Sequence, residues 1–194
     1  MDKLLRSDLL PLEKYDEVRK DHRAKTMRHK RDRHLSVGPN ATLYFEDRVT
    51  IQYQIQEMLR VEKIFDVEGI EQELATYNPL IPDGANLKAT FMIEFEDVDI
   101  RKQRLSELLG IESCMWMQVA EFDRVAPICN EDLERSTDEK TSSVHFMRFE
   151  LTNEMIQALK EDANLSAGID HRKYQYTVSP IAENIRQSLV DDLD

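Results

Sequence analysis

The sequence predicts an α+β fold, with an antiparallel or mixed β-sheet, flanking helices and a basic N-terminal helix. Residues 87–95 read LKATFMIEF, and their strict alternation of apolar and polar side chains indicates a half-buried strand. Residues 51–65 repeat apolar side chains at three- and four-residue intervals, which is typical of an amphipathic helix. Such segments follow one another without regular β-α-β alternation, which favours an antiparallel or mixed sheet over a parallel one.

The chain opens with a helix and a hairpin. Residues 8–34 have helical periodicity, with Ser7 or Asp8 as the expected N-cap. The next stretch alternates on both sides of a Gly38-Pro39-Asn40 turn, and this pattern predicts a β-hairpin.

Asp47 is placed to cap the helix that follows the hairpin. The core face of this helix is expected to consist of Ile51, Ile55, Met58, Leu59 and Phe65. Glutamines stand at 52, 54 and 56, and side chains at this spacing cannot all point one way. Gln52 and Gln56 are therefore expected on a solvated face. Gln54 and Glu57 lie on a flank, where they can hydrogen-bond to another element or subunit.

The remaining elements are mixed in type and joined by short connections. The earlier ones are expected to be a helix at 68–77, the strand at 87–95, a helix at 98–109 ended by Gly110, and a strand at 113–122. The later ones are expected to be an acidic loop or short helix at 130–143, a strand at 144–151, a helix that begins at Thr152 or Asn153, a hairpin or a pair of short edge strands at 167–178, and a terminal helix from Pro180 to Leu189.

Length and composition favour one domain over residues 1–194, with a basic helical segment at 8–34 and an acidic body at 35–194. Two cysteines, Cys114 and Cys129, lack C-x-x-C spacing, which disfavours a disulfide scaffold and a cysteine-based zinc site. No cofactor and no metal are expected. No apolar run is long enough to cross a bilayer, and the acidic start is unlike a signal peptide, so we expect a cytoplasmic protein without membrane contact.

Charge is distributed unevenly along the chain. Residues 19–34 carry eight Lys and Arg against two Asp, a net charge of +6, which leaves 18 basic and 36 acidic residues, or −18, elsewhere. This pattern predicts docking to an acidic protein or self-association. A further interpretation is that the basic segment lies across the acidic helices and body of the protein itself. The expected contact residues are Arg19, Arg23, Arg28, Lys30 and Arg31. Nucleic-acid binding is a weaker alternative, because no aromatic residue lies between Tyr15 and Tyr44 to stack on bases.

A second candidate site is the polar face of the predicted sheet. Its members are Lys88, Glu94, Trp116, Gln118, Arg148 and Glu150. If the strands bring these side chains together, they can bind a small polar or anionic ligand, or serve an enzyme. The simpler interpretation is that the acids and bases pair with one another. His145 shares a face with apolar residues and is expected at the edge of the core.

Common catalytic signatures are missing from the sequence. It contains no G-x-G-x-x-G, no phosphate-binding G-x-x-x-x-G-K-S/T, no G-x-S-x-G and no H-E-x-x-H. His22 and His29 share a helix face, but the surrounding cations disfavour a divalent metal there. Catalytic residues are therefore not identified, and whether the protein is an enzyme stays open.

Several phrases together resemble the bacterial family known as domain of unknown function 3501. They are VGPNATLYFEDRVTIQYQIQEMLRVEKIF, YNPLIPDGANLKATFMIE, DLERSTDEKTSSVHFMRFELT and GIDHRKY. The resemblance extends over nearly the whole chain and implies a role beside rubrerythrin-type proteins and an iron–sulfur oxidoreductase. It supplies no active-site residues. Since this chain lacks the cysteines that ligate a cluster, the implied role is that of an accessory protein and not of an electron carrier.

Overall fold

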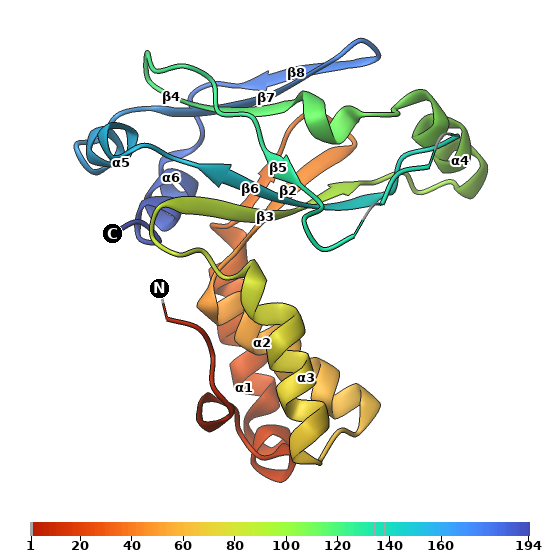
Figure 1. Ribbon diagram of the computed structural model, residues 1–194, viewed down its shortest axis with the longest axis vertical. Coiled ribbons are helices and arrows are strands. Elements are labelled where there is room, and N and C mark those ends of the chain that lie inside the picture. Colours follow the sequence, from red (N-terminus) through yellow and green to blue (C-terminus); the bar gives the residue numbers. More distant parts are fainter. Residues whose placement is uncertain (1, 134, 138) are drawn as a thin grey trace.

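The computed structural model describes residues 2–133, 135–137 and 139–194. It confirms an α+β fold in which two antiparallel sheets lie above a layer of three helices (Figure 1). The acidic loop expected at 130–143 includes Glu134 and Asp138, which lie outside the described residues.

The larger sheet has the strand order β1-β2-β3-β6-β5, and all neighbours are antiparallel. Its strands are β1 (His34–Ser36), β2 (Ala41–Glu46), β3 (Asn86–Ile93), β6 (Val144–Glu150) and β5 (Ile128–Cys129). The predicted hairpin is β1–β2. The alternation in β3 buries Leu87, Ala89, Phe91 and Ile93, as expected.

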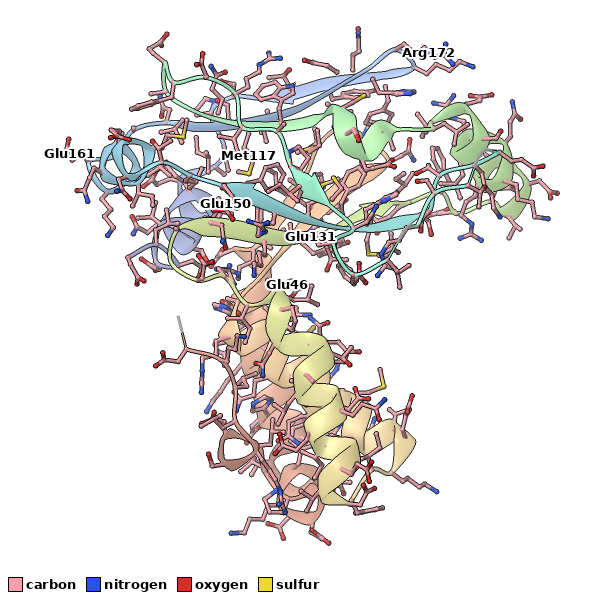
Figure 2. The ribbon with its side chains drawn as sticks, in the orientation of Figure 1. Glu46, Met117, Glu131, Glu150, Glu161 and Arg172 are labelled. Carbon is pink, nitrogen blue, oxygen red and sulfur yellow. The ribbon has the colours of Figure 1, made fainter. Side chains whose placement is uncertain are left out.

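A second sheet consists of β4 (Met115–Val119), β7 (Leu165–His171) and β8 (Tyr174–Val178). The main hydrophobic core lies between the two sheets, where Met117 is fully buried (Figure 2). The helices α5 (Asn153–Lys160) and α6 (Glu183–Val190) pack on one end of this core, and α4 (Val98–Glu107) lies at the other end (Figure 1).

The helical layer contains α1 (Leu12–Arg31), α2 (Arg48–Glu62) and α3 (Val67–Tyr77). A smaller hydrophobic cluster holds it together, formed by Leu4, Ile51, Ile55, Leu59, Leu74 and Ile81. The predicted core face of α2 is therefore confirmed at positions 51, 55 and 59. Phe65 is an error of that prediction, because α2 ends before it and its side chain is 64% exposed.

Helix ends explain where the predictions succeed and fail. The Asp47 side chain accepts a hydrogen bond from the Thr50 amide, and Thr152 caps α5, as expected. The N-cap of α1 is instead Pro11, which offers no side-chain acceptor, because Ser7 and Asp8 belong to a separate 3₁₀ turn. The last helix begins at Glu183, three residues after the expected Pro180.

The expectation that Gln52 and Gln56 lie on a solvated face of α2 is wrong. Gln56 is only 1% exposed; its side chain accepts a hydrogen bond from the Leu10 amide (2.6 Å) and donates one to the Leu10 carbonyl (3.2 Å). Gln52 donates to the Asp8 carbonyl (2.6 Å). The segment before α1 crosses over this face and excludes water, which the helical pattern alone does not reveal. Gln54 donates to Glu46 (2.9 Å), as its flank position allowed.

A search of the helices in the described part of the chain finds none with the length and apolar character needed to cross a membrane.

Candidate functional site

The six polar residues predicted on one sheet face do not form one site. Trp116 and Gln118 belong to β4, which pairs with β7 in the smaller sheet. Glu94 follows β3 at its far end and accepts hydrogen bonds from Thr42 and Tyr44. The expectation of a shared surface is therefore wrong for these residues. Strand pairing places Trp116 and Gln118 in the other sheet, and Glu94 lies at the opposite end of β3 from Lys88.

Trp116 and Gln118 have local structural partners. The Trp116 ring lies against Gly168, whose lack of a side chain makes room for it, and the Arg124 guanidinium stacks over the ring at 3.8 Å. Gln118 donates a hydrogen bond to the Phe122 carbonyl (2.8 Å). Both side chains thus contribute to packing around the smaller sheet.

Two of the six predicted residues, Lys88 and Arg148, line a cavity of about 560 Å³. The cavity lies between the larger sheet and the end of α3, in the region where Figure 2 labels Glu46 and Glu131. Most of its lining is apolar, and the main contributors are Tyr77, Leu80, Ile128, Leu133 and Phe146. Its size and lining are those of a small-molecule site.

Lys88 stands on β3 directly opposite Arg148 on β6. Its ammonium group donates to the carbonyls of Pro79 (2.7 Å) and Ile81 (3.0 Å), and so ties the loop after α3 to the sheet. Burial lowers the pKa of Lys88, and the nearby Arg148 charge lowers it further, whereas Asp83 opposes the shift.

Arg148 holds a carboxylate at the edge of the cavity. Its Nε and Nη2 donate to the two oxygens of Glu131 at 2.8 and 2.7 Å, and its Nη1 contacts Glu150. These hydrogen bonds raise the pKa of Arg148, and the same bonds lower the pKa of Glu131. The Glu131 side chain is 54% exposed and belongs to the loop after β5.

Arg135 is a cavity residue that the sequence prediction missed. Its guanidinium stacks on Phe146 at 4.4 Å and contacts Asp132. Its Nε is buried and has no hydrogen-bond partner among the described residues. The loop gives no periodic signal, so nothing in the sequence indicated that this arginine turns inward.

Glu46 is the second residue that was missed. It is 5% exposed at the end of β2 and accepts hydrogen bonds from Thr50 (2.6 Å), Gln54 (2.9 Å) and Thr90 (2.9 Å). These bonds join the first turns of α2 to β3. The sequence did contain a signal for this role, because Glu46 immediately precedes the helix-capping Asp47 and a carboxylate is stabilised near a helix N-terminus.

The basic helix α1 packs along α2, and part of its charge is neutralised within the molecule. Arg19 forms two hydrogen bonds of 2.8 Å to Glu57, which also accepts from the Tyr15 hydroxyl. Lys30 is half-buried over the Tyr53 ring. Arg19 and Lys30 therefore contribute little to an accessible surface.

After Arg19 along the chain, the Lys and Arg residues of α1 other than Lys30 remain exposed. We call them the α1 cationic surface: Lys20, Arg23, Lys25, Arg28 and Arg31. None of the five forms an ion pair with a carboxylate in the described part of the chain. Three of the five residues predicted for partner binding, Arg23, Arg28 and Arg31, belong to this surface.

Residues that often carry chemistry are in unreactive settings here. His145 is fully buried; its Nε2 lies 2.9 Å from the Thr141 hydroxyl and 3.1 Å from the Ser142 carbonyl, and burial lowers its pKa. Burial likewise raises the pKa of the Cys129 thiol to about 12, which keeps it protonated and poorly nucleophilic. His29 contacts Asp47 at the end of α1.

The sequence model of one protein family, described as "Protein of unknown function (DUF3501)", matches residues 3–193. The chain belongs to this family. The cavity and the α1 cationic surface are therefore features of a DUF3501 protein.

One solved structure similar to this DUF3501 chain is that of a novel protein of unknown function from Burkholderia pseudomallei K96243. The two sequences are 48% identical, the match covers 100% of each chain, and the TM-score is 0.94. The two proteins therefore share the whole fold, including the helical layer. A search of curated proteins found no match.

Proposed function

We propose that this protein is a non-catalytic accessory protein of the bacterial cytosol that docks an acidic protein through the α1 cationic surface. The observation that carries the proposal is that five cations of one helix are exposed without ion-pair partners among the described residues, in a protein whose net charge is −12. Such a local reversal of charge attracts and orients an acidic partner.

The anchoring of α1 supports this function. Glu57 holds the helix near its middle, and the 2% exposed Arg33, just beyond its end, contacts Asp47 and Asp192. The cations therefore project from a helix fixed at two points. A partner that binds them does not have to order the backbone, so less entropy is lost on binding.

The family resemblance implies which proteins to test as partners. These are a rubrerythrin-type protein and the iron–sulfur oxidoreductase that accompanies it. A second copy of this chain is the competing partner, since its remaining residues carry a charge of −18. Nucleic acid is disfavoured because Asp16, Glu17 and Asp21 interrupt the cations along α1, and no exposed aromatic side chain lies among them.

The test is calorimetric titration of each purified candidate partner from the same organism, at low and at high salt. Binding is expected to weaken with salt, because the contacts are between exposed charges. The variant with Arg23→Glu, Arg28→Glu and Arg31→Glu is expected to lose about tenfold or more in affinity. The measured quantity is the dissociation constant.

A matched control reverses three other cations by Lys160→Glu, Arg172→Glu and Lys173→Glu. These exposed residues produce the same change in net charge, and Arg172 lies at the end of the molecule opposite the helical layer (Figure 2). The control is expected to keep most of the affinity. Equal losses in both variants, binding that α1 reversal leaves unchanged, or tighter binding to duplex DNA than to any protein would overturn the proposal.

A further inference from the structure

The cavity beside α3 contains more hydrogen-bond donors than its own acceptors satisfy. Lys88 uses two of its three ammonium hydrogens on backbone carbonyls, which leaves one. The Nε of Arg135 is buried and has no partner among the described residues. Unpaired buried donors are costly and uncommon, so the Nε of Arg135 points to an acceptor that is supplied from outside. The free ammonium hydrogen of Lys88 can serve the same acceptor.

Two opposed cations of the cavity require an anion beside them. Lys88 and Arg148 are directly opposite on neighbouring strands, and like charges in this position repel unless an anion lies near them. Other charges near the pair are the cation Arg135 and the carboxylates Glu46, Asp83, Glu131, Asp132 and Glu150. Glu46 is held by Thr50, Gln54 and Thr90, and Glu150 contacts Arg148. Asp83 accepts a hydrogen bond from the Ala85 amide (3.0 Å), and Asp132 contacts Arg135.

The remaining carboxylate, Glu131, already occupies the place that a ligand would take. It lies in the fork of Arg148 with both oxygens hydrogen-bonded, which is the usual recognition geometry for a carboxylate. Because its side chain is 54% exposed, this ion pair is a weak one that is easily exchanged. The protein thus shows, with its own side chain, which group fits Arg148.

From these observations we infer that the cavity binds an amphipathic carboxylate, whose carboxylate displaces Glu131 from Arg148 and whose apolar body lies against Leu80, Ile128, Leu133 and Phe146. The volume of about 560 Å³ falls within the range of small-molecule sites. Ligand binding in this cavity is separate from docking through α1 and does not depend on it.

The test uses octanoate as the probe, with octanol and octylamine as neutral and cationic analogues of the same length. Octanoate is expected to bind with a dissociation constant of about 1 mM or tighter. Both analogues are expected to bind about tenfold more weakly. The octanol hydroxyl offers the arginine fork a single neutral acceptor atom, and the ammonium group of octylamine offers none. Nuclear Overhauser contacts from the octanoate chain are expected to the methyl groups of Leu80, Ile128 and Leu133.

Two variants separate ligand recognition from a merely structural role. Glu131→Gln removes the internal competitor and is expected to tighten octanoate binding about three- to tenfold. Arg148→Gln removes the fork and is expected to weaken it about tenfold or more. The control variants are Glu161→Gln and Arg172→Gln, at exposed positions away from the cavity (Figure 2), and neither should change the affinity.

Several outcomes would overturn the inference. One such outcome is that octanol binds as tightly as octanoate. Another is that the Glu131→Gln variant binds octanoate no more tightly than the parent protein does. Nuclear Overhauser contacts to other parts of the protein would do the same. The triple charge reversal on α1 should leave octanoate binding intact, so failure of the docking proposal and failure of this one are distinguishable.

Discussion

Glu57 is the residue that holds the middle of the basic helix against α2. It accepts hydrogen bonds from Arg19 and from the Tyr15 hydroxyl. The bonds from Arg19 have the largest effect and lower its pKa from 4.5 to about 2. Since the folded-state pKa is the lower one, the stabilisation is fully present above pH 4.5 and is lost as the pH falls toward 2.

We therefore expect Glu57→Gln to lower the free energy of unfolding by about 1 kcal/mol at neutral pH. Urea unfolding should be measured at several pH values. The difference in the free energy of unfolding between the parent and the variant should become smaller below pH 4.5. Glu71→Gln, at an exposed position of α3, is the control and should show no such narrowing. A difference in the free energy of unfolding that stays constant down to the lowest pH would contradict this role of Glu57.

Arg33 is two positions beyond Arg31, yet their environments are opposite. Arg31 is exposed at the last position of α1, whereas Arg33 is 2% exposed. The Arg33 guanidinium donates to the carbonyls of Phe45 (3.1 Å), Glu46 (3.0 Å) and Ser188 (2.9 Å), and it contacts Asp192. It therefore joins β2 to the C-terminal helix.

Arg33→Met should destabilise the protein by about 3–5 kcal/mol, because it leaves buried carboxylates without their cation. Arg31→Met should change the free energy of unfolding by about 0.5 kcal/mol or less. Urea unfolding of both variants measures the difference. Losses of similar size would mean that the buried arrangement of Arg33 is wrong.

At the scale of elements, the segment before α1 is bound by two glutamine side chains of α2. Gln56 pairs with both backbone groups of Leu10, and Gln52 adds a bond to the Asp8 carbonyl. These contacts position the start of α1 against the helical layer. Without them the segment before α1 would lose these links to α2, whereas the first turn of the helix would keep the bond from Tyr15 to Glu57.

Gln56→Ala should cost about 1 kcal/mol or more, since it removes the partly buried hydrogen bonds from Gln56 to the Leu10 amide and carbonyl. Hydrogen exchange should accelerate at the Leu10 amide, while amides of the sheets keep their protection. Gln72→Ala, at an exposed position of α3, is the control. Unchanged exchange at Leu10 in the Gln56 variant would refute the anchoring role.

The sequence predicted most elements because their patterns are local. Alternation identified β3, and capping residues located the starts of α2 and α5. The same pattern could not assign Gln56 correctly, because its burial depends on a segment about 46 residues away in sequence. For the same reason β4 was assigned to the wrong surface, since local alternation does not specify which strand is the neighbour.

At the scale of the whole molecule, the layer of α1, α2 and α3 meets the larger sheet along one boundary. Glu46 and Arg33 lie on it, and separate hydrophobic clusters fill the space on either side. The cavity opens on this boundary, and α1 extends away from it (Figure 1). The charge asymmetry was readable from the sequence, but which cations stay exposed was not, because that depends on how α1 packs.

Zero-length carbodiimide cross-linking tests the central claim most directly, because it joins an amine to a carboxylate only when the two are in contact. In the complex with the rubrerythrin-type protein or the iron–sulfur oxidoreductase, peptide mapping should find amide links from Lys20 and Lys25 to partner carboxylates. Links that start from Lys160 or Lys173 instead, or a complex with no link to α1, would contradict docking through the α1 cationic surface.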